Sequence, residues 1–263
     1  MIPFDIVYFR PDSLEEAVEA WRAAPEGSLY YSGGTEIVTG CRSGTYRPAA
    51  VIDLKRIPEL RSHGAVGARL FFGAALSLNE AAEAGGFPLL SAAAKKIADR
   101  TVRNRITLGG NVAGRLPFRE ALLPFLAADG RAHLAGPAAG GGVERRELPV
   151  RELHSKRLHL RPGEFLVGLS VDGEAAAAAC AHERSTAGAS VDYPILALCA
   201  VAMKGLVSVA VSGVHDYPLW ADSSAGPLAV ESLPTPKNDH RASAEYRAEL
   251  LRAALSRVQE ALS

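Results

Sequence analysis

The sequence predicts an α+β protein made of two α+β units followed by a third one. The chain has 263 residues, of which 48% are hydrophobic and 22% are charged, so it is long enough to bury a sizeable core. Short strand-like segments recur between amphipathic helices, two of which begin with a capping-box sequence. Two pairs of adjacent glycines, 33–34 and 109–110, fall in different units, and each pair suits a turn that exposes backbone amides.

The first unit covers residues 1–56 and has a predicted β-α-β-α-β order. Its first helix begins at Ser13 and Glu16, which have capping-box spacing, and apolar residues follow at helical intervals until Pro25. The second strand runs directly into the first glycine pair, and a short helix follows that pair. After the opening strand, the unit is expected to contain strands at 28–31 and 49–54 and a helix at 37–41.

The second unit covers residues 57–174. Ser77 and Glu80 repeat the capping box, and Pro88 suits the first position of the next helix. A Gly/Ala-rich segment, 136–142, is typical of the tip of a hairpin. Strands are predicted at 70–76, 131–134, 142–148 and 164–171, and a helix is predicted at 120–128.

The third unit covers residues 175–263 and begins at a run of alanines, 175–179, which marks the boundary. Two apolar strands are predicted at 195–203 and 206–214, with a turn at Lys204–Gly205. A closing helix is predicted over about 243–262, because apolar residues recur on one face of it.

Composition and charge argue against several classes of protein. Lys+Arg and Asp+Glu both number 29, and a net charge of zero gives no support for a nucleic-acid partner. Met1 is not followed by a basic and then apolar leader, and the longest apolar run is about half of a bilayer span. We therefore expect a cytoplasmic protein without a membrane span. Three separated cysteines cannot supply the four thiolates of an ordinary iron–sulfur cluster, and the histidines have no metal-ligand spacing.

Both glycine pairs suit an anion site. Ser32–Glu36 joins a strand to a helix start, which is the arrangement that binds phosphate. Thr107–Asn111 adds a threonine and an asparagine, whose side chains can bond ligand oxygens or the loop itself. Neither segment is a G-x-G-x-x-G or P-loop sequence, which argues against a Rossmann domain and a P-loop NTPase. We predict that the two segments converge on the pyrophosphate of one dinucleotide; ordinary structural turns are the alternative.

Charged residues near these segments have open roles. Glu120 begins a predicted helix just past the second glycine pair, and its carboxylate either complements the helix dipole or contacts sugar hydroxyls of the ligand. Arg103 and Arg105 either add positive charge near a phosphate or form a solvated turn. Arg184 either reaches an edge of the ligand or, as we expect, is a surface arginine.

The chain resembles the FAD-binding (medium) subunits of the molybdenum hydroxylases, the family of xanthine dehydrogenase and carbon monoxide dehydrogenase. Family members carry A-G-G-T-[DE], which residues 32–36 match with serine for alanine, and I-R-N-x-A-T-[IL]-G-G-N, which residues 102–111 match with Ile106 for alanine. The resemblance implies a PCMH-type (vanillyl-alcohol-oxidase-like) fold. In it, FAD lies between subdomains 1–56 and 57–174, and 175–263 form a small C-terminal α+β domain.

The resemblance also implies a set of FAD-binding residues and no acid–base catalytic residue in this chain. The implied FAD-binding residues are Leu29, Tyr30, Tyr31, Ser32, Gly33, Gly34, Thr35, Glu36, Thr107, Leu108, Gly109, Gly110, Asn111, Glu120 and Leu166.

The implied role is electron transfer within an oxidoreductase. Substrate is hydroxylated at a molybdopterin site on a large partner subunit, and electrons pass through two [2Fe–2S] clusters on a small partner subunit. FAD on this chain then delivers them to NAD or another acceptor. The protein's part is to position the flavin and set its electrostatic surroundings.

The chain departs from the family pattern just after Asn111. Gly114 occupies a position that is usually polar, and 115–120 replace a polar stretch ending in an aspartate, for which Glu120 stands in. Gly114 and Leu116 motivate a second interpretation, a scaffold subunit that has lost tight FAD binding. A third interpretation is a stand-alone flavin reductase, which would need acid residues that the sequence does not display.

Overall fold

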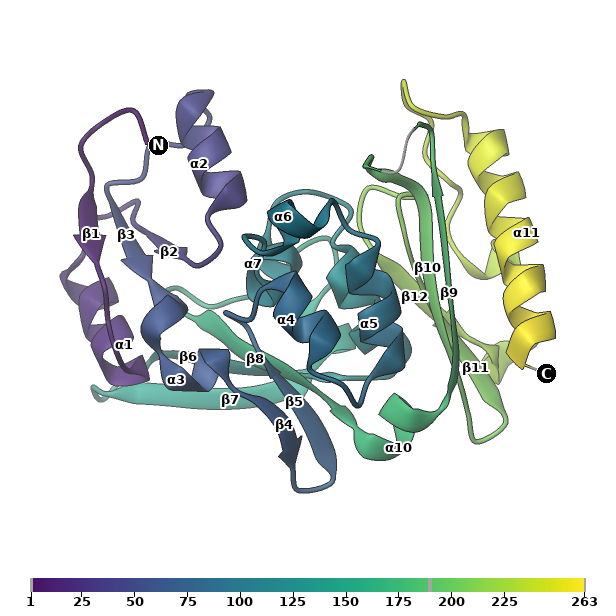
Figure 1. The fold of residues 1–263 in the computed structure, drawn as a ribbon, viewed down its shortest axis with the longest axis horizontal. Coiled ribbons are helices and arrows are strands. Elements are labelled where there is room, and N and C mark those ends of the chain that lie inside the picture. Colours follow the sequence, from purple (N-terminus) through teal and green to yellow (C-terminus); the bar gives the residue numbers. More distant parts are fainter. Residues whose placement is uncertain (1, 189–190, 263) are drawn as a thin grey trace.

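A computed structural model describes residues 2–188 and 191–262, and three sheets follow one another along the chain (Figure 1). A three-stranded sheet lies at the N-terminal end, a five-stranded sheet forms the base, and a four-stranded sheet backed by one long helix forms the C-terminal end. The sheets lie within 1–56, 57–174 and 175–263, the ranges expected from the sequence; the boundaries themselves stay predictions. In the part of the chain that the structure describes, no helix is both long and apolar enough to cross a bilayer.

The N-terminal unit has the predicted β-α-β-α-β order, which the structure confirms. Strands β1 and β2 both pair with β3 in parallel, in the order β1-β3-β2. Ser13 caps the first helix by accepting a hydrogen bond from the Glu16 amide at 3.1 Å. The elements are β1 (Val7–Phe9), α1 (Leu14–Ala23), β2 (Leu29–Tyr31), α2 (Thr35–Arg42) and β3 (Ala50–Asp53).

The middle unit is an antiparallel sheet in the order β4-β5-β8-β6-β7. Strand β4 was not predicted, because it is exposed and contains Gly64, so it lacks an apolar alternation. The elements are η1 (Leu54–Arg56), α3 (Pro58–Arg61), β4 (His63–Val66), β5 (Arg69–Gly73), β6 (Arg131–Pro137), β7 (Val143–Pro149), α9 (Val150–Leu153) and β8 (Phe165–Asp172).

Strand β8 joins the first two units, because both of its faces are buried. Phe165 and Val167 belong to the apolar cluster that includes Leu14 and Ile52 of the N-terminal unit. Leu166 packs instead into the cluster built around the middle helices. Since alternate residues of a strand point to opposite faces, one strand supports two cores.

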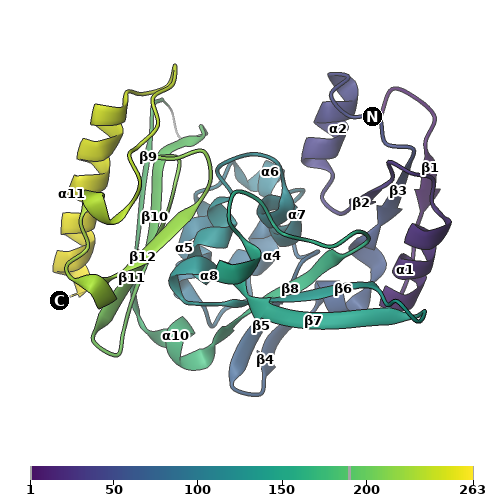
Figure 2. The ribbon, with the colours of Figure 1, turned by 180° about the vertical axis from the view of Figure 1, so that it is seen from behind.

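Short helices fill the space between the middle sheet and the C-terminal sheet (Figures 1 and 2). The capping box predicted at Ser77 and Glu80 is present, and Phe72, Phe87 and Phe125 pack edge-to-face or tilted at their centre. The helices are α4 (Leu78–Glu83), α5 (Pro88–Lys95), α6 (Arg100–Arg103), α7 (Leu108–Ala113), η2 (Glu120–Leu122) and α8 (Leu123–Ala127).

The helix predicted over 120–128 is divided in two. Residues Glu120–Leu122 form a 3₁₀ turn, and the α-helix starts at Leu123 with Pro124 in its first turn. Proline is suited to the first turn of a helix, because it has no N–H to donate to the preceding turn. The division leaves Glu120 at the junction between the helices and the C-terminal sheet.

The C-terminal unit is an antiparallel sheet in the order β12-β11-β10-β9. Its predicted hairpin is confirmed: Lys204 and Gly205 both have positive φ, as a two-residue turn between twisted strands requires. Strand β9 was not predicted, because its alanines and charged residues carry no apolar alternation. The elements are α10 (Gly173–Ala177), β9 (Ala179–Thr186), β10 (Pro194–Met203), β11 (Leu206–Ser212), β12 (Leu219–Asp222), η3 (Ser223–Ala225), η4 (Val230–Ser232) and α11 (Ala244–Leu262).

Candidate functional site

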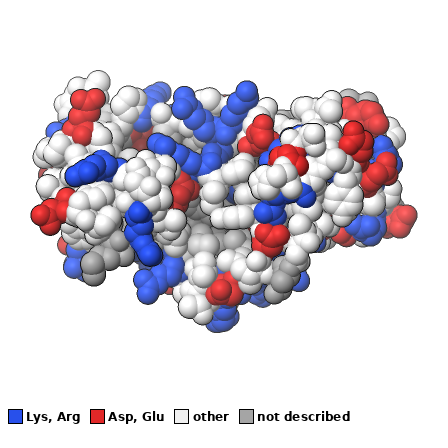
Figure 3. Space-filling view, turned by 90° about the horizontal axis from the view of Figure 1, so that it is seen from above, with Lys and Arg blue, Asp and Glu red and all other residues white. Residues whose placement is uncertain are grey.

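A cavity of about 940 Å³ lies where the three units meet. Its walls come from β2 and α2, from α7 and the loop after it, and from residues 191–193 before β10. Arg115 is an exposed cation of this wall, whereas Arg119 is buried. Figure 3 shows Lys and Arg side chains beside a hollow in the middle of the upper face. The size suits an extended small-molecule ligand.

The first glycine pair forms a turn that presents unused amides. Gly34 has φ of +73° and immediately precedes helix α2, a conformation that favours glycine. The N–H groups of residues 34–37 donate to no other described residue, and the first intrahelical bond of this turn is from Val38 to the Gly34 carbonyl. The Ser32 hydroxyl is buried and has no partner among the described residues. Unused amides at the positive end of a helix are groups that can bind an anion.

Lys55, which is bonded to Asp53, contacts the first glycine turn. The Lys55 ammonium donates to the Ser32 carbonyl at 3.1 Å and to both carboxylate oxygens of Asp53 at 2.7 Å. It also lies 4.4 Å from the centre of the Tyr31 ring. Asp53 in turn accepts a hydrogen bond from the Tyr8 hydroxyl. These contacts attach the turn to the end of β3 and to the residues after it.

The second glycine pair differs from the expectation. Thr107 caps α7, and Gly109 and Gly110 lie inside its first turn with negative φ, so this segment is a helix start and not a second open turn. The amides of Leu108 and Gly109 donate to the carbonyls of Leu76 and Ala74, both at 2.8 Å. The Gly110 amide donates to the Thr107 hydroxyl, and the Asn111 amide donates to the Thr107 carbonyl. All four amides are thus occupied inside the protein.

The two segments nevertheless converge, as predicted. The Gly33 amide donates to the Thr107 hydroxyl at 3.4 Å. A Cβ atom on Gly33 would collide with the carbonyl oxygen of Arg105 and lie 3.0 Å from the Thr107 amide nitrogen. Glycine is required here for close backbone packing, and Gly33 and Thr107 both line the cavity.

The predicted site residues line this cavity with one exception. Leu108 does not line it, because its side chain is fully buried in the middle core. The predicted residues that do line it are Leu29, Tyr30, Tyr31, Ser32, Gly33, Gly34, Thr35, Glu36, Thr107, Gly109, Gly110, Asn111, Glu120 and Leu166.

Several of these lining residues already have protein partners. Tyr30 donates to the Gly163 carbonyl at 2.9 Å, and burial raises its pKa well above the usual range. The side-chain Oδ1 of Asn111 accepts a hydrogen bond from the Ala121 amide at 3.0 Å. In the described structure these residues shape the wall. The side-chain amide NH₂ of Asn111 is still available as a hydrogen-bond donor.

Glu120 and Arg184 form a buried ion pair with an Nε–Oε2 distance of 2.7 Å. Their side chains are 5% and 10% exposed, so the interpretation of Arg184 as a surface residue is wrong. Burial raises the pKa of Glu120, while the Arg184 guanidinium counteracts that shift. Arg184 also donates to the Asp192 carbonyl at 2.7 Å and so connects Glu120 to the segment before β10.

Arg103 and Arg105, whose roles the sequence left open, differ in their surroundings. The Arg103 guanidinium donates to the Asn79 side chain and to the carbonyls of Ile97 and Ala98, so it stabilises the helical layer. Arg105 is exposed.

Two features of the wall escaped the sequence analysis. The rings of Phe118 and Tyr193 stack at 4.6 Å with an interplanar angle of 14°. Arg119 is buried and donates to the His154 Nε2 at 2.8 Å and to the Lys156 carbonyl at 2.9 Å. No spacing in the sequence signals either contact, because each joins segments that are distant along the chain.

His154 gives a testable pH dependence. Burial and the neighbouring Arg119 lower its pKa to about 4, so the folded protein holds it neutral. Between about pH 6.5 and 4 the unfolded chain binds a proton that the folded protein does not, and stability is lost as the pH falls, by up to about 3 kcal/mol. His154→Gln keeps an acceptor for Arg119 and should reduce this loss. Urea unfolding at pH 7.5 and pH 5 measures it; equal pH dependence in both proteins would contradict the assignment.

Comparisons with known proteins agree with this architecture. A family model described as the FAD binding domain in molybdopterin dehydrogenase matches residues 3–171. The carbon monoxide dehydrogenase medium chain of Hydrogenophaga pseudoflava is 29% identical over 224 residues, which is 78% of each chain. The medium chain from Afipia carboxidovorans is 25% identical and covers 99% of this chain and 97% of its own length.

A solved structure of a copper- and molybdenum-containing CO dehydrogenase, in its cyanide-inactivated form, superposes with a TM-score of 0.86. It is 24% identical and covers 100% of this chain and 99% of its own, and the likeness supports the expected PCMH-type α+β fold. The family match spans the first two units and includes both glycine pairs. The chain therefore belongs to the family of FAD-binding domains of molybdopterin dehydrogenases, as an FAD-binding medium subunit of the molybdenum hydroxylase type and hence an oxidoreductase subunit.

Proposed function

We propose that this chain is the FAD-carrying electron-transfer subunit of a molybdenum-dependent hydroxylase or dehydrogenase. Electrons from [2Fe–2S] clusters on a small partner subunit pass through FAD on this chain to NAD or another acceptor. The substrate is oxidised at a molybdopterin site on a large partner subunit. The observation that carries the proposal is the cavity between the units, with the unused amides of residues 34–37 at one end.

The residues present fit FAD. The amides at the start of α2 and the Ser32 hydroxyl are donors without protein partners, and a pyrophosphate needs such donors. Thr35 and the Asn111 amino group provide further polar contacts in the wall. Apolar residues, including Leu29 and Leu166, line the remainder. When bound, FAD supplies redox chemistry that the side chains lack, and the chain supplies position and electrostatics.

The partner assignment follows from what this chain lacks. Cys41 lies on α2, whereas Cys180 and Cys199 lie on strands of the C-terminal sheet, and all three are free thiols. An ordinary iron–sulfur cluster needs four thiolates, so we assign the clusters to another subunit. The matched relatives are named medium chains, which is consistent with a larger and a smaller partner. We propose a cytoplasmic location for the complex.

The test is a cofactor analysis of the complex purified with its natural partners. We expect about one FAD per copy of this chain after extraction, together with molybdenum and iron on the co-purifying subunits. Anaerobic reoxidation of the substrate-reduced complex by NAD, compared with an artificial acceptor, identifies the acceptor. A complex with metals but no extractable FAD would instead identify a scaffold subunit. A chain that purifies alone and reduces a substrate with FAD would favour a flavin reductase.

A further inference from the structure

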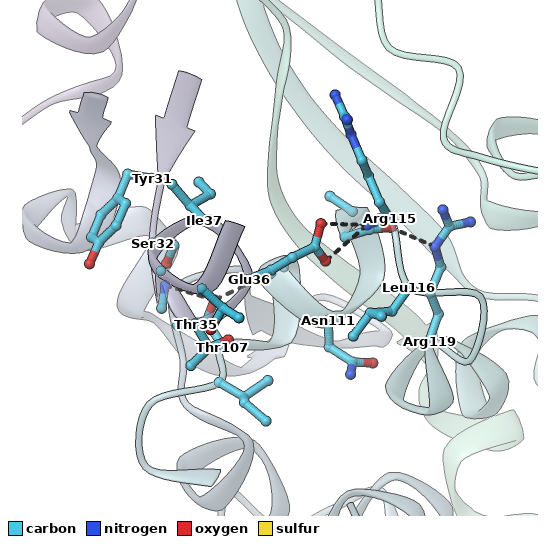
Figure 4. Close-up of a pocket in the computed structure, with 18 of the residues that line it drawn as sticks. Tyr31, Ser32, Thr35, Glu36, Ile37, Thr107, Asn111, Arg115, Leu116 and Arg119 are labelled. Carbon is cyan, nitrogen blue, oxygen red and sulfur yellow. Dashed lines mark hydrogen bonds between the residues drawn. The ribbon is translucent and has the colours of Figure 1, made fainter. Parts of the chain in front are cut away.

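Glu36 joins two units across the cavity. It lies in the first turn of α2, and its two carboxylate oxygens accept hydrogen bonds from the Arg115 amide at 3.1 and 3.0 Å (Figure 4). The Tyr46 hydroxyl donates to the same carboxylate at 2.8 Å. Glu36 and Arg115 are 79 residues apart and both line the cavity. The carboxylate is therefore bonded to two other segments of the protein.

Gly114 makes this contact possible. A Cβ atom at that position would lie 2.8 Å from Glu36 Oε2 and 2.9 Å from the Gly110 carbonyl oxygen. The φ of Gly114 is −59°, which any residue can adopt, so the requirement is for space and not for an unusual conformation. The glycine that departs from the family motif thus has a physical role in this chain.

The loop 114–119 has a second attachment, which Arg119 provides. Arg119, which has φ of +39°, donates from Nε to the Gly114 carbonyl at 2.9 Å. Its Nη1 donates to the His154 Nε2 and to the Lys156 carbonyl, and these bonds attach the loop to residues 154–156. Between these anchors, Leu116 lines the cavity and is 45% exposed. The loop is consequently a strap whose two ends are joined by the bond from Arg119 to Gly114, and Glu36 holds its Arg115 amide to α2.

We propose that Glu36 is a positioning residue that holds this strap closed over the cavity and thereby sets how long FAD stays bound. The inference rests on the proposed FAD site. Without the carboxylate, the strap loses its hydrogen bonds to α2 at Arg115, and residues 115–118 can move away from α2 while Arg119 still holds Gly114. FAD then leaves faster through the widened opening, although none of its own contacts has been removed.

The first test measures FAD release from the full chain, purified with its accompanying subunits, by the rise in flavin fluorescence after dilution. Glu36→Ala should accelerate release by about tenfold or more, since a hydrogen bond to a charged acceptor is lost. Glu36→Gln keeps an acceptor and should change release less. The control is Glu15→Ala, which removes an exposed carboxylate from the first turn of α1 and should leave release unchanged. Gly114→Ala should reproduce the Glu36→Ala effect.

The second test needs no cofactor. Arg115 is exposed, and limited trypsin digestion of FAD-free protein reports how often the strap opens at that residue. Glu36→Ala should raise the cleavage rate at Arg115 several-fold relative to cleavage elsewhere. Unchanged cleavage and release in Glu36→Ala would overturn the inference. Equal acceleration in Glu15→Ala would also overturn it, because loss of an unrelated carboxylate would then suffice. If wild-type protein binds no FAD, the proposed function fails, while cleavage at Arg115 still tests the strap.

Discussion

Gly33→Val is expected to abolish FAD retention, with affinity reduced by at least about a hundredfold. The side chain would collide with the Arg105 carbonyl and crowd the Thr107 amide. Both neighbours are backbone atoms, so they cannot rotate away as a flexible side chain could. The turn before α2 must therefore separate from the start of α7, and the amides of residues 34–37 lose their position at the end of the cavity.

This substitution should also lower stability, because forcing atoms into a packed site costs about 1–3 kcal/mol. FAD content after desalting and the thermal midpoint of the FAD-free protein separate the two effects. Gly140→Ala is the matched control, because a Cβ there meets no atom within 4 Å and its φ is not positive. A Gly33→Val protein that kept its full FAD would show that the contact between the two segments does not organise the site.

Arg184→Leu is expected to destabilise the protein by about 3–5 kcal/mol at neutral pH. The substitution leaves the Glu120 carboxylate buried without its cation, and an uncompensated buried charge is costly. The pair is also bonded to the Asp192 carbonyl, so the segment carrying Tyr193 loses a donor. Urea unfolding followed by far-UV circular dichroism measures the change in free energy.

The pH dependence of this variant has a definite sign. Burial already raises the pKa of Glu120, and removing Arg184 raises it further. A carboxyl group with a raised pKa in the folded state stabilises the protein at low pH, and this stability is lost as the pH rises through that pKa. The difference between wild type and variant should thus shrink from pH 7.5 to pH 5. Glu120→Gln in the variant background should recover most of the lost stability at pH 7.5.

The control is an exposed ion pair made by Glu183, the residue next to Arg184 on β9. Arg257 contacts Glu183 at 3.0 Å, but the two side chains are 52% and 30% exposed. Exposed pairs contribute about 0–1 kcal/mol, so Arg257→Leu should have a small effect with little change between the two pH values. If Arg184→Leu were equally mild, the Glu120–Arg184 pair would not behave as a buried one.

Much of the fold could be predicted from local signals. The capping residues Ser13 and Ser77, the turn at Lys204–Gly205 and the apolar face of the last helix each act within a few residues, so they are legible in the sequence. Strands β4 and β9 were missed because their side chains alternate weakly or are half exposed. Both strands form by antiparallel pairing with a neighbour, β5 for β4 and β10 for β9, and this pairing is not visible in their own residues.

The sequence predicted which segments line the candidate site, but not which of their backbone amides stay unused. Both glycine pairs were assigned the same role, but only the pair at 33–34 leaves amides unused, because Leu76 and Ala74 accept those of Leu108 and Gly109. Gly33 is needed for backbone packing against Arg105, and Gly114 is needed for space beside Glu36. A sequence shows that a position is glycine but not which atom approaches it.

The sequence by itself determined the three-unit α+β order, the family and the two segments that meet at the cavity. These depend on local propensity, hydrophobic period and short motifs, all of which act between near neighbours in the chain. Tertiary structure alone decided which amides stay free, that Glu120 pairs with Arg184 across 64 residues, and that Glu36 holds the Arg115 amide across 79. The physical reason is that hydrogen bonds and ion pairs depend on distances of a few ångströms, and only the folded chain brings such distant residues together.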